Sequence, residues 1–331
     1  MTEKQYLGGD TLYLLPSVAH TQSMGIVLKS DKGVAVIDGG TANESLQLEE
    51  LLSSLGGVVD GWFLTHPHHD HIQALIGILE RGKIKINKIY YDFPDEEYIA
   101  RIELRDRRVS CVPALKKAIA EAGAKSGAKP GAKSGKKADA DSGAESDIKS
   151  GVKADADSGE ESDAKSGVKA DADSGEESDI KSGVKAEKPI KGKPIYAAGF
   201  TFLPISEGKA FADDLNCSSV AYKIKTRGDD VLILGDMNYK RQQELIDEFG
   251  DILPTPIVQM AHHGQQGVNE EFYKLVGPEV CLWCTPRWLW ENDPAGKGYD
   301  SGPYKTTETR GWIEKIGAKN VTAFDKTVML K

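Results

Sequence analysis

The feature that most constrains this chain is a cluster of histidines at residues 66–71. Four of the seven histidines in the sequence fall there, in Thr65-His-Pro-His-His-Asp-His71. An apolar, strand-like run at 58–64 precedes the cluster and a helix-like run at 72–79 follows it. Burying four imidazoles and a carboxylate between such elements is costly unless a ligand compensates. Because Zn²⁺ takes imidazole nitrogens and carboxylate oxygens, the cluster predicts a metal site rather than a surface histidine cluster or a tag remnant.

The spacing within this cluster indicates two adjacent metal positions. His66 and His68 alternate at the end of a strand, so their side chains share one face. Asp70 and His71 begin the following helix and approach from the other side. One short segment can therefore supply ligands to two cations.

Residues 123–193 differ in composition from the rest of the chain. They contain no aromatic residue and include three copies of a sixteen-residue repeat, at 137–152, 153–168 and 169–184. Each copy has too few apolar side chains to offset the entropy lost on folding. The Asp-Ala-Asp-Ser-Gly runs lack an oxygen ligand at the position that an EF-hand loop requires, which disfavours calcium binding. We expect a disordered insertion with no known partner.

The flanking segments have the periodicities of one folded domain. Apolar strands come in groups, and amphipathic helices follow them, as at 44–55 and 241–249. Such grouping favours two sheets packed face to face with helices outside, a four-layer α/β fold. We expect one folded domain, with its first half at 1–122 and its second half at 194–331.

Composition and charge limit the classes of molecule that this protein is expected to bind. The net charge is −9 and no segment is basic overall, so we expect a small-molecule substrate rather than a nucleic acid. No membrane-length apolar run and no signal-peptide pattern occur, which predicts a cytoplasmic protein without a membrane segment. Cys281 and Cys284 fall on opposite faces of a strand-like run, so core packing is favoured over a zinc or redox pair.

His66-x-His68-x-Asp70-His71 resembles the signature of the metallo-β-lactamase superfamily. Three further segments agree with that family in order and spacing: Val-Ile-Asp-Gly-Gly at 36–40, Leu-Ile-Leu-Gly-Asp at 232–236 and Met-Ala-His-His-Gly at 260–264. The resemblance extends over residues 10–330. It implies an αββα sandwich with two divalent metal ions at one edge, Zn²⁺ or alternatively Mn²⁺ or Fe²⁺.

The resemblance also implies roles for the matching residues. One metal ion would bind His66 and His68, the other Asp70 and His71. Asp236 would bridge both ions. The second site would be completed by His263 rather than His262, because the family ligand directly precedes a turn residue, here Gly264.

Further roles implied by the resemblance concern orientation and catalysis. Asp38 would orient a ligand imidazole. Asp70 would also orient the nucleophile, a metal-bridging hydroxide, and His262 would donate a proton or hydrogen bond to the substrate.

The sequence departs from most of the family at one point. Lactamases, glyoxalase II and most lactonases have another histidine between the cluster and the bridging aspartate, whereas this chain has none between His71 and His262. The Asn-x-x-Ser element, Asn216 to Ser219, instead resembles phosphorylcholine esterases and the hydrolase domain of a competence DNA-uptake channel. Asn216 and Ser219 would then support the metal ligands.

The function implied is hydrolysis of a small phosphodiester, such as a phosphorylcholine ester. Alternatives are hydrolysis of a carboxylic ester, thioester or lactone, a nuclease, or an interaction protein that uses the repeat tract and has a vestigial metal site. Aromatic residues after the last motif could form a cage that binds a cation through ring faces, or could pack in the core. They are Trp283, Trp288, Trp290, Tyr299 and Tyr304.

Overall fold

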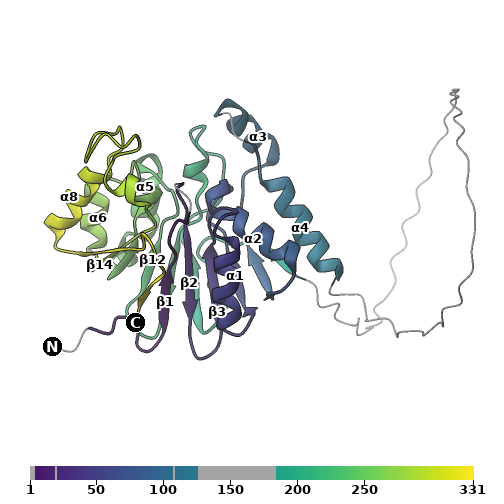
Figure 1. Ribbon diagram of the computed structural model, residues 1–331. Helices are drawn as coiled ribbons and strands as arrows, with labels where there is room; N and C mark the ends of the chain where they lie inside the picture. The colour runs from purple at the N-terminus through teal and green to yellow at the C-terminus, as the bar shows by residue number, and fades with distance from the viewer. Residues whose placement is uncertain (1–3, 19–20, 107–108, 126–183) are drawn as a thin grey trace, which may run out of the picture. The chain divides into compact units, whose positions relative to one another are not determined.

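The computed structural model describes residues 4–18, 21–106, 109–125 and 184–331, and the structural statements below concern these residues. Two seven-stranded sheets pack against each other between two layers of helices (Figure 1). This is the expected αββα sandwich. The repeats up to residue 183, and with them the predicted disorder, lie outside the described residues.

The first sheet has the strand order β16-β1-β2-β3-β5-β7-β8. Neighbours from β16 to β3 are antiparallel, and those from β3 to β8 are parallel. Its strands are β1 (Thr11–Leu14), β2 (Gly25–Lys29), β3 (Val34–Asp38), β5 (Gly61–Phe63), β7 (Lys88–Tyr90), β8 (Lys185–Glu187) and β16 (Val328–Leu330). A separate pair consists of β4 (Val58–Val59) and β6 (Lys85–Ile86).

The second sheet has the order β15-β14-β13-β12-β11-β10-β9. Its strands from β9 to β12 are antiparallel and those from β12 to β15 are parallel. They are β9 (Ile195–Ala197), β10 (Phe200–Pro204), β11 (Tyr222–Lys225), β12 (Val231–Ile233), β13 (Ile257–Gln259), β14 (Val280–Trp283) and β15 (Lys319–Thr322).

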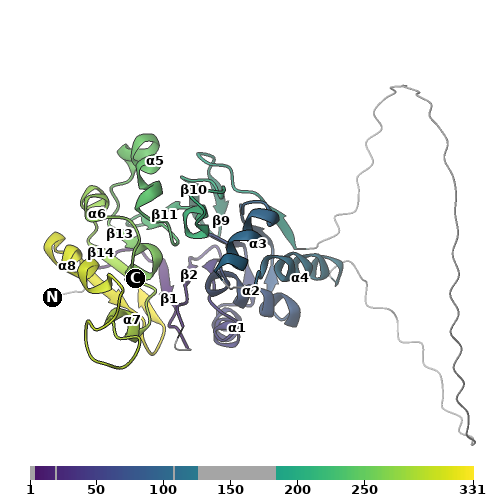
Figure 2. The ribbon, with the colours of Figure 1, turned by 90° about the horizontal axis from the view of Figure 1, so that it is seen from above.

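Helices cover the outer face of each sheet (Figures 1 and 2). On the first sheet lie α1 (Ser45–Ser54), α2 (His69–Arg81) and α4 (Val112–Lys125), and α3 (Glu96–Arg105) precedes α4. On the second lie α5 (Tyr239–Phe249), α6 (Glu270–Val276) and α8 (Thr306–Ile316), with the short α7 (Arg287–Trp290) before α8. Three 3₁₀ turns are η1 (Leu215–Ser218), η2 (Gly250–Ile252) and η3 (Ala261–Gly264). No helix among the described residues is long and apolar enough to span a bilayer.

Three apolar clusters hold these layers together. Between the sheets, the ring of Phe63 from β5 stacks on Phe202 from β10, with 3.8 Å between ring centroids. Strand β3 is apolar at successive positions and buried throughout, because helices cover one face and the second sheet the other. On β14, Cys281 packs in the helix-facing cluster, whereas Cys284, just after the strand, packs between the sheets. The predicted core packing of these two cysteines is therefore confirmed.

The boundaries predicted for the insertion, 123–193, are too wide at both ends. Helix α4 continues to Lys125, and β8 pairs in parallel with β7 as the edge strand of the first sheet. Strand β8 has the sequence Lys-Ala-Glu, and all three side chains are exposed. Its composition therefore resembles the tract, although its backbone belongs to the sheet.

Candidate metal centre

The histidine cluster lies where β5 gives way to α2. His68 has an extended backbone and is the residue immediately before the helix, while Asp70 and His71 lie in its first turn. A carboxylate there is favoured by the positive end of the helix dipole. Ile72, Leu75, Ile76 and Leu79 anchor α2 in the outer core at the spacing of one helix face, which fixes the first turn against the sheet.

The other predicted ligands follow parallel strands of the second sheet. Asp236 comes after β12, and His262 and His263 come after β13 in η3. The carboxyl ends of adjacent parallel strands share one sheet edge, so these loops lie side by side. They meet the β5–α2 segment there, since His66 Nε2 lies 3.7 Å and His71 Nε2 lies 3.3 Å from Asp236 Oδ2.

Two groups of buried side chains could each hold a metal ion. In each group, one ligand atom from every residue lies within 4.8 Å of the others. The first group is His66, His68 and Asp236, and the second is Asp70, His71, Asp236 and His263. Asp236 is common to both, which is the arrangement that a bridging carboxylate requires.

The second group leaves ligand atoms buried without hydrogen bonds. His71 Nε2, His263 Nε2 and Asp236 Oδ1 have no hydrogen-bond partner among the described residues. His263 Nε2 lies 3.2 Å from Asp70 Oδ2 and 3.5 Å from Asp236 Oδ2 without the angles of a hydrogen bond. Since buried polar atoms are nearly always paired, nitrogens and oxygens that converge in this way fit a cation.

Electrostatics in the cluster favour the charged carboxylates. Burial raises the pKa of Asp236, but His263, His71 and His66 outweigh it and hold that pKa well below its ordinary value. Burial disfavours the charged form of His263, yet Asp236 and Asp70 raise its pKa to about 10. The carboxylates are thus held ionised and need positive charge beside them, which a divalent cation supplies when the imidazoles are neutral.

Both imidazoles of the second group are oriented by their other ring nitrogen. His71 Nδ1 donates to Asp38 Oδ2 over 2.8 Å, and His263 Nδ1 donates to the carbonyl oxygen of Cys284 over 2.7 Å. Asp38 is itself held by the backbone N–H and the hydroxyl of Thr65, each at 2.8 Å. These contacts direct the Nε2 lone pairs of His71 and His263 into the cluster. Asp38 therefore accepts a hydrogen bond from the imidazole of His71, a candidate ligand, which is the contact that the family resemblance implied.

The two adjacent histidines of η3 point to different places. Both have left-handed backbones, with φ of 51° for His262 and 54° for His263, which costs about 1–2 kcal/mol per residue. His263 is fully buried in the ligand group, whereas the His262 side chain is 20% exposed and its Nε2 is 4.0 Å from Asp236 Oδ2. At Gly264, a Cβ would lie 2.0 Å from the Trp283 ring, so only glycine allows this turn.

Comparisons with known proteins agree with this geometry. Residues 20–125 match the model of the metallo-beta-lactamase superfamily, and the match includes the histidine cluster. The fold is similar to the metallo-beta-lactamase fold protein YhfI from Bacillus subtilis, with 13% identity, a TM-score of 0.50, and coverage of 97% of this chain and 99% of the other. It is also similar to yeast PDE1, with 11% identity, a TM-score of 0.51 and coverage of 98% and 99%.

Residues 20–125 thus match the metallo-beta-lactamase superfamily, and the two solved structures share the fold over nearly the whole chain. Asp236 and His263 lie beyond the segment that the family model matches, so their part in the centre rests on the distances given above. No curated protein sequence is similar enough to count as a match.

One contact beside the candidate centre was missed by sequence reasoning. The fully buried amide of Gln259 joins the two loops that carry Asp236 and His263. Its Oε1 accepts from the N–H groups of Leu234 and Gly235, each at 2.9 Å, and its Nε2 donates to the carbonyls of Gly235 and Met260. The sequence did contain a signal for this contact, namely a glutamine in an otherwise apolar strand. A buried side-chain amide must form hydrogen bonds with neighbouring groups.

Asn216 and Ser219 lie beside the centre. Ser219 Oγ accepts from the backbone N–H of Asp236 over 3.0 Å and so supports the residue that both candidate ligand groups share. Asn216 lines a pocket of about 320 Å³ with His68, Asp70, Asp236 and His262. Its Oδ1 is buried without a hydrogen-bond partner among the described residues and is available to a ligand.

Of the five aromatic residues that were predicted to form a substrate cage, two line the pocket beside the centre and three do not. Trp288 and Tyr304 line the metal pocket, with 5.7 Å between their ring centroids. Trp283 is fully buried against the helices of the second sheet, so the expectation that it contacts substrate is wrong. Trp290 packs edge-on against Trp283, and Tyr299 is 65% exposed; neither lines the pocket.

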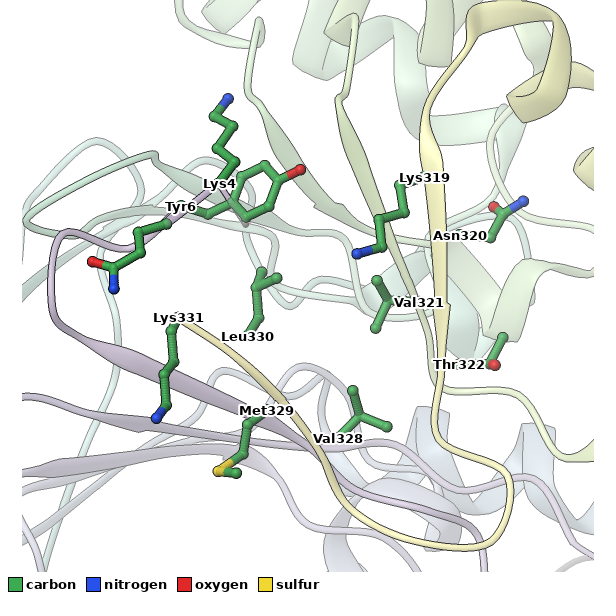
Figure 3. A pocket seen from close by; sticks show the side chains of 11 residues that line it. Lys4, Tyr6, Lys319, Asn320, Val321, Thr322, Val328, Met329, Leu330 and Lys331 are labelled. Atoms are coloured by element: carbon green, nitrogen blue, oxygen red, sulfur yellow. The ribbon is translucent and has the colours of Figure 1, made fainter. Parts of the chain in front are cut away.

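A different cavity of about 950 Å³ lies between the edge strands β15 and β16. Figure 3 shows its walls, with Lys319, Val321 and Thr322 on one side and Val328 to Lys331 on the other. None of its lining residues is a candidate metal ligand. The smaller pocket is the one that candidate ligands line, namely His68, Asp70 and Asp236.

Proposed function

We propose that this metallo-beta-lactamase domain is a metal-dependent hydrolase of small phosphodiesters, with two Zn²⁺ ions as cofactors. The observation that carries this proposal is the convergence of two buried ligand groups on one shared carboxylate, Asp236. The proposed ligands are His66, His68, Asp70, His71, Asp236 and His263. Two divalent ions bound there would supply a water acidified to near neutral pKa and positive charge for the transition state.

In this proposal, Asp70 and His262 have different roles around the centre. Asp70 faces both the second ligand group and the pocket, so one carboxylate oxygen can accept a hydrogen bond from the attacking water. His262 lies at the pocket wall, and burial lowers its pKa. A neutral His262 near the oxygen that leaves could donate a hydrogen bond to it.

The phosphodiester preference is supported by the polar side chains beside the ligands. Asn216 and His262 bring hydrogen-bonding groups to the same pocket as the ligands, which suits the two non-bridging oxygens and the ester oxygen of a phosphodiester. Carboxylic esters, thioesters and lactones have one carbonyl oxygen and make less use of these groups. They therefore serve as comparison substrates.

The test is hydrolysis by the protein loaded with Zn²⁺ or Mn²⁺. We expect turnover of p-nitrophenyl phosphorylcholine and bis-p-nitrophenyl phosphate to exceed that of p-nitrophenyl acetate, a thioester and a lactone. His68→Ala should abolish most of it, while Asp251→Asn, at an exposed site on η2, serves as the control. Faster lactone or thioester hydrolysis, or full activity of His68→Ala, would refute the proposal.

A further inference from the structure

We propose that Arg241, a fully buried residue of α5, is a positioning residue for substrate binding. It holds η1, and with it Asn216 in the wall of the metal pocket, through the carbonyl oxygen of Cys217. Arg241 itself does not line that pocket. The inference rests on the proposed function, because it gives Asn216 a contact with the phosphate group of the substrate.

A buried arginine is costly at this place in the fold. Arg241 lies in the first turn of α5, and its side chain is fully buried. Its Nε donates to Glu244 Oε2 over 3.1 Å, whereas its Nη2 has no hydrogen-bond partner among the described residues. A buried charge with an unpaired donor destabilises a fold relative to a well-packed apolar side chain. The stability of α5 therefore does not explain an arginine here.

The contact between Arg241 and η1 supplies an explanation. Arg241 Nη1 donates to the carbonyl oxygen of Cys217 over 2.6 Å. Hydrogen bonds from charged donors are stronger than neutral ones, and this one is buried away from water. Cys217 directly follows Asn216, so the contact fixes the backbone one residue from a side chain that lines the metal pocket.

The start of α5 also holds the other end of η1. Asn238, the N-cap of α5, donates from Nδ2 to Asp214 Oδ2 over 2.6 Å. Asp214 Oδ1 in turn accepts from the backbone N–H of Asn216 over 3.0 Å. Because Asn238 comes two residues after Asp236, these contacts tie Asn216 to the carboxylate that both ligand groups share.

Glu244 keeps the guanidinium of Arg241 in place. One of its carboxylate oxygens accepts from Arg241, and the other accepts from Lys209 Nζ over 3.0 Å. Burial raises the pKa of Glu244, but the contacts with Arg241 and Lys209 outweigh it and hold that pKa below its ordinary value. The ionised carboxylate fixes Nε of Arg241, which directs Nη1 at the Cys217 carbonyl.

The exact place of Asn216 matters because its side chain shares the pocket with candidate ligands. The pocket of about 320 Å³ is lined by Asn216 together with His68, Asp70 and Asp236. A phosphate group at the candidate ligands therefore meets the Asn216 amide. Hydrogen bonds weaken steeply with distance and angle, so a shift of η1 costs this contact without removing a metal ligand. Arg241 thus acts on substrate binding through Asn216.

A double-mutant cycle on ligand binding tests this role without any turnover. The probe is phenylphosphonate, whose P–C bond is not hydrolysed, and its affinity for the Zn²⁺-loaded protein is measured by isothermal titration. We expect Arg241→Met and Asn216→Ala each to weaken binding about fivefold, and the double variant to bind no more weakly than Asn216→Ala. Arg241→Lys, which keeps a cation, should recover part of the loss.

The matched control is Lys240→Met, which removes a positive charge from the neighbouring, exposed position of α5. It should leave the affinity for phenylphosphonate unchanged, and Zn²⁺ content should be unchanged in every variant. If Arg241→Met does not fold, Arg241→Lys takes its place in the same cycle.

Kinetics separate this inference from the proposed function. In Arg241→Met, KM for bis-p-nitrophenyl phosphate should rise about fivefold, while kcat stays within about twofold of the wild type. If phosphodiesters are hydrolysed but the Arg241 and Asn216 substitutions act additively, or Arg241→Met binds the probe as the wild type does, the positioning role is overturned and the proposed function stands. If the two substitutions are coupled but the wild type hydrolyses no phosphodiester, the proposed function fails and Arg241 still positions Asn216.

Discussion

On the first sheet, one short segment that runs from the end of β5 into the first turn of α2 delivers four of the six candidate ligands. The second sheet delivers Asp236 and His263 from separate loops after β12 and β13. The first contribution is set by local geometry, a strand end followed by a helix start. The second depends on two parallel strands remaining in register, which the Gln259 amide secures. Candidate ligands that lie close together in the sequence need only contacts that orient their side chains. Candidate ligands from separate loops also need contacts that hold those loops next to each other.

The largest effect is expected from Asp236→Asn, because this residue belongs to both ligand groups. An amide cannot bridge two cations as a carboxylate does, so several kcal/mol of transition-state stabilisation is lost. We expect phosphodiester turnover to fall by about 10³-fold or more, as measured by steady-state kinetics. Full turnover with full metal content would contradict the role of Asp236.

In the first sheet, Asp38→Asn tests how a ligand from the contiguous segment is oriented. The carboxylate that accepts from His71 Nδ1 is replaced by an amide, which weakens the fixing of the His71 tautomer. Affinity for Zn²⁺, measured by competition with a chromogenic chelator, should fall about 10- to 100-fold. An affinity within twofold of the wild type would show that Asp38 does not orient His71.

The matching test in the second sheet is Gln259→Leu. It removes the acceptor of two buried N–H groups, those of Leu234 and Gly235, and separates the loops of Asp236 and His263. We expect Zn²⁺ affinity to fall about tenfold and the free energy of unfolding by about 2–4 kcal/mol.

Gln243→Leu, at an exposed position of α5, is the control for Gln259→Leu and should change neither quantity. Lower stability of Gln259→Leu with unchanged Zn²⁺ affinity would mean that Gln259 supports the fold but not the centre.

The smallest effect is expected from Cys281→Ala. Cys281 is a buried free thiol in the helix-facing cluster, and burial raises its pKa to about 12, which keeps it protonated. Metal content and turnover should be unchanged, and the free energy of unfolding should fall by about 1 kcal/mol. Loss of metal in this variant would contradict its assignment to the core.

The sequence allowed most of the centre to be predicted because its ligands fall in short motifs at strand ends. His66, His68, Asp70 and His71 form one pattern. Asp38 ends an apolar strand, and Asp236 and His263 each come soon after one. Such strands are buried on both faces, so they can be recognised in the sequence as continuous apolar runs. The side-by-side placement of these strand ends then follows from the four-layer fold.

Other features had no local signal. The Cys284 carbonyl that orients His263 is a backbone group, so the residue type gives no indication of it. Strand β8 exposes all three side chains, and only its pairing with β7 makes it a strand. Trp283 is different, because the strand period does place its ring with Cys281 on the helix-facing side, away from the pocket.

The central claim, that two ligand groups share Asp236, is tested most directly by the metal content of purified, Zn²⁺-saturated protein, measured by inductively coupled plasma mass spectrometry. The account predicts about two equivalents per chain in the wild type, and about one each in His66→Ala and in His263→Ala, because each variant disrupts a different group. One equivalent or less in the wild type, or two retained in both variants, would contradict it.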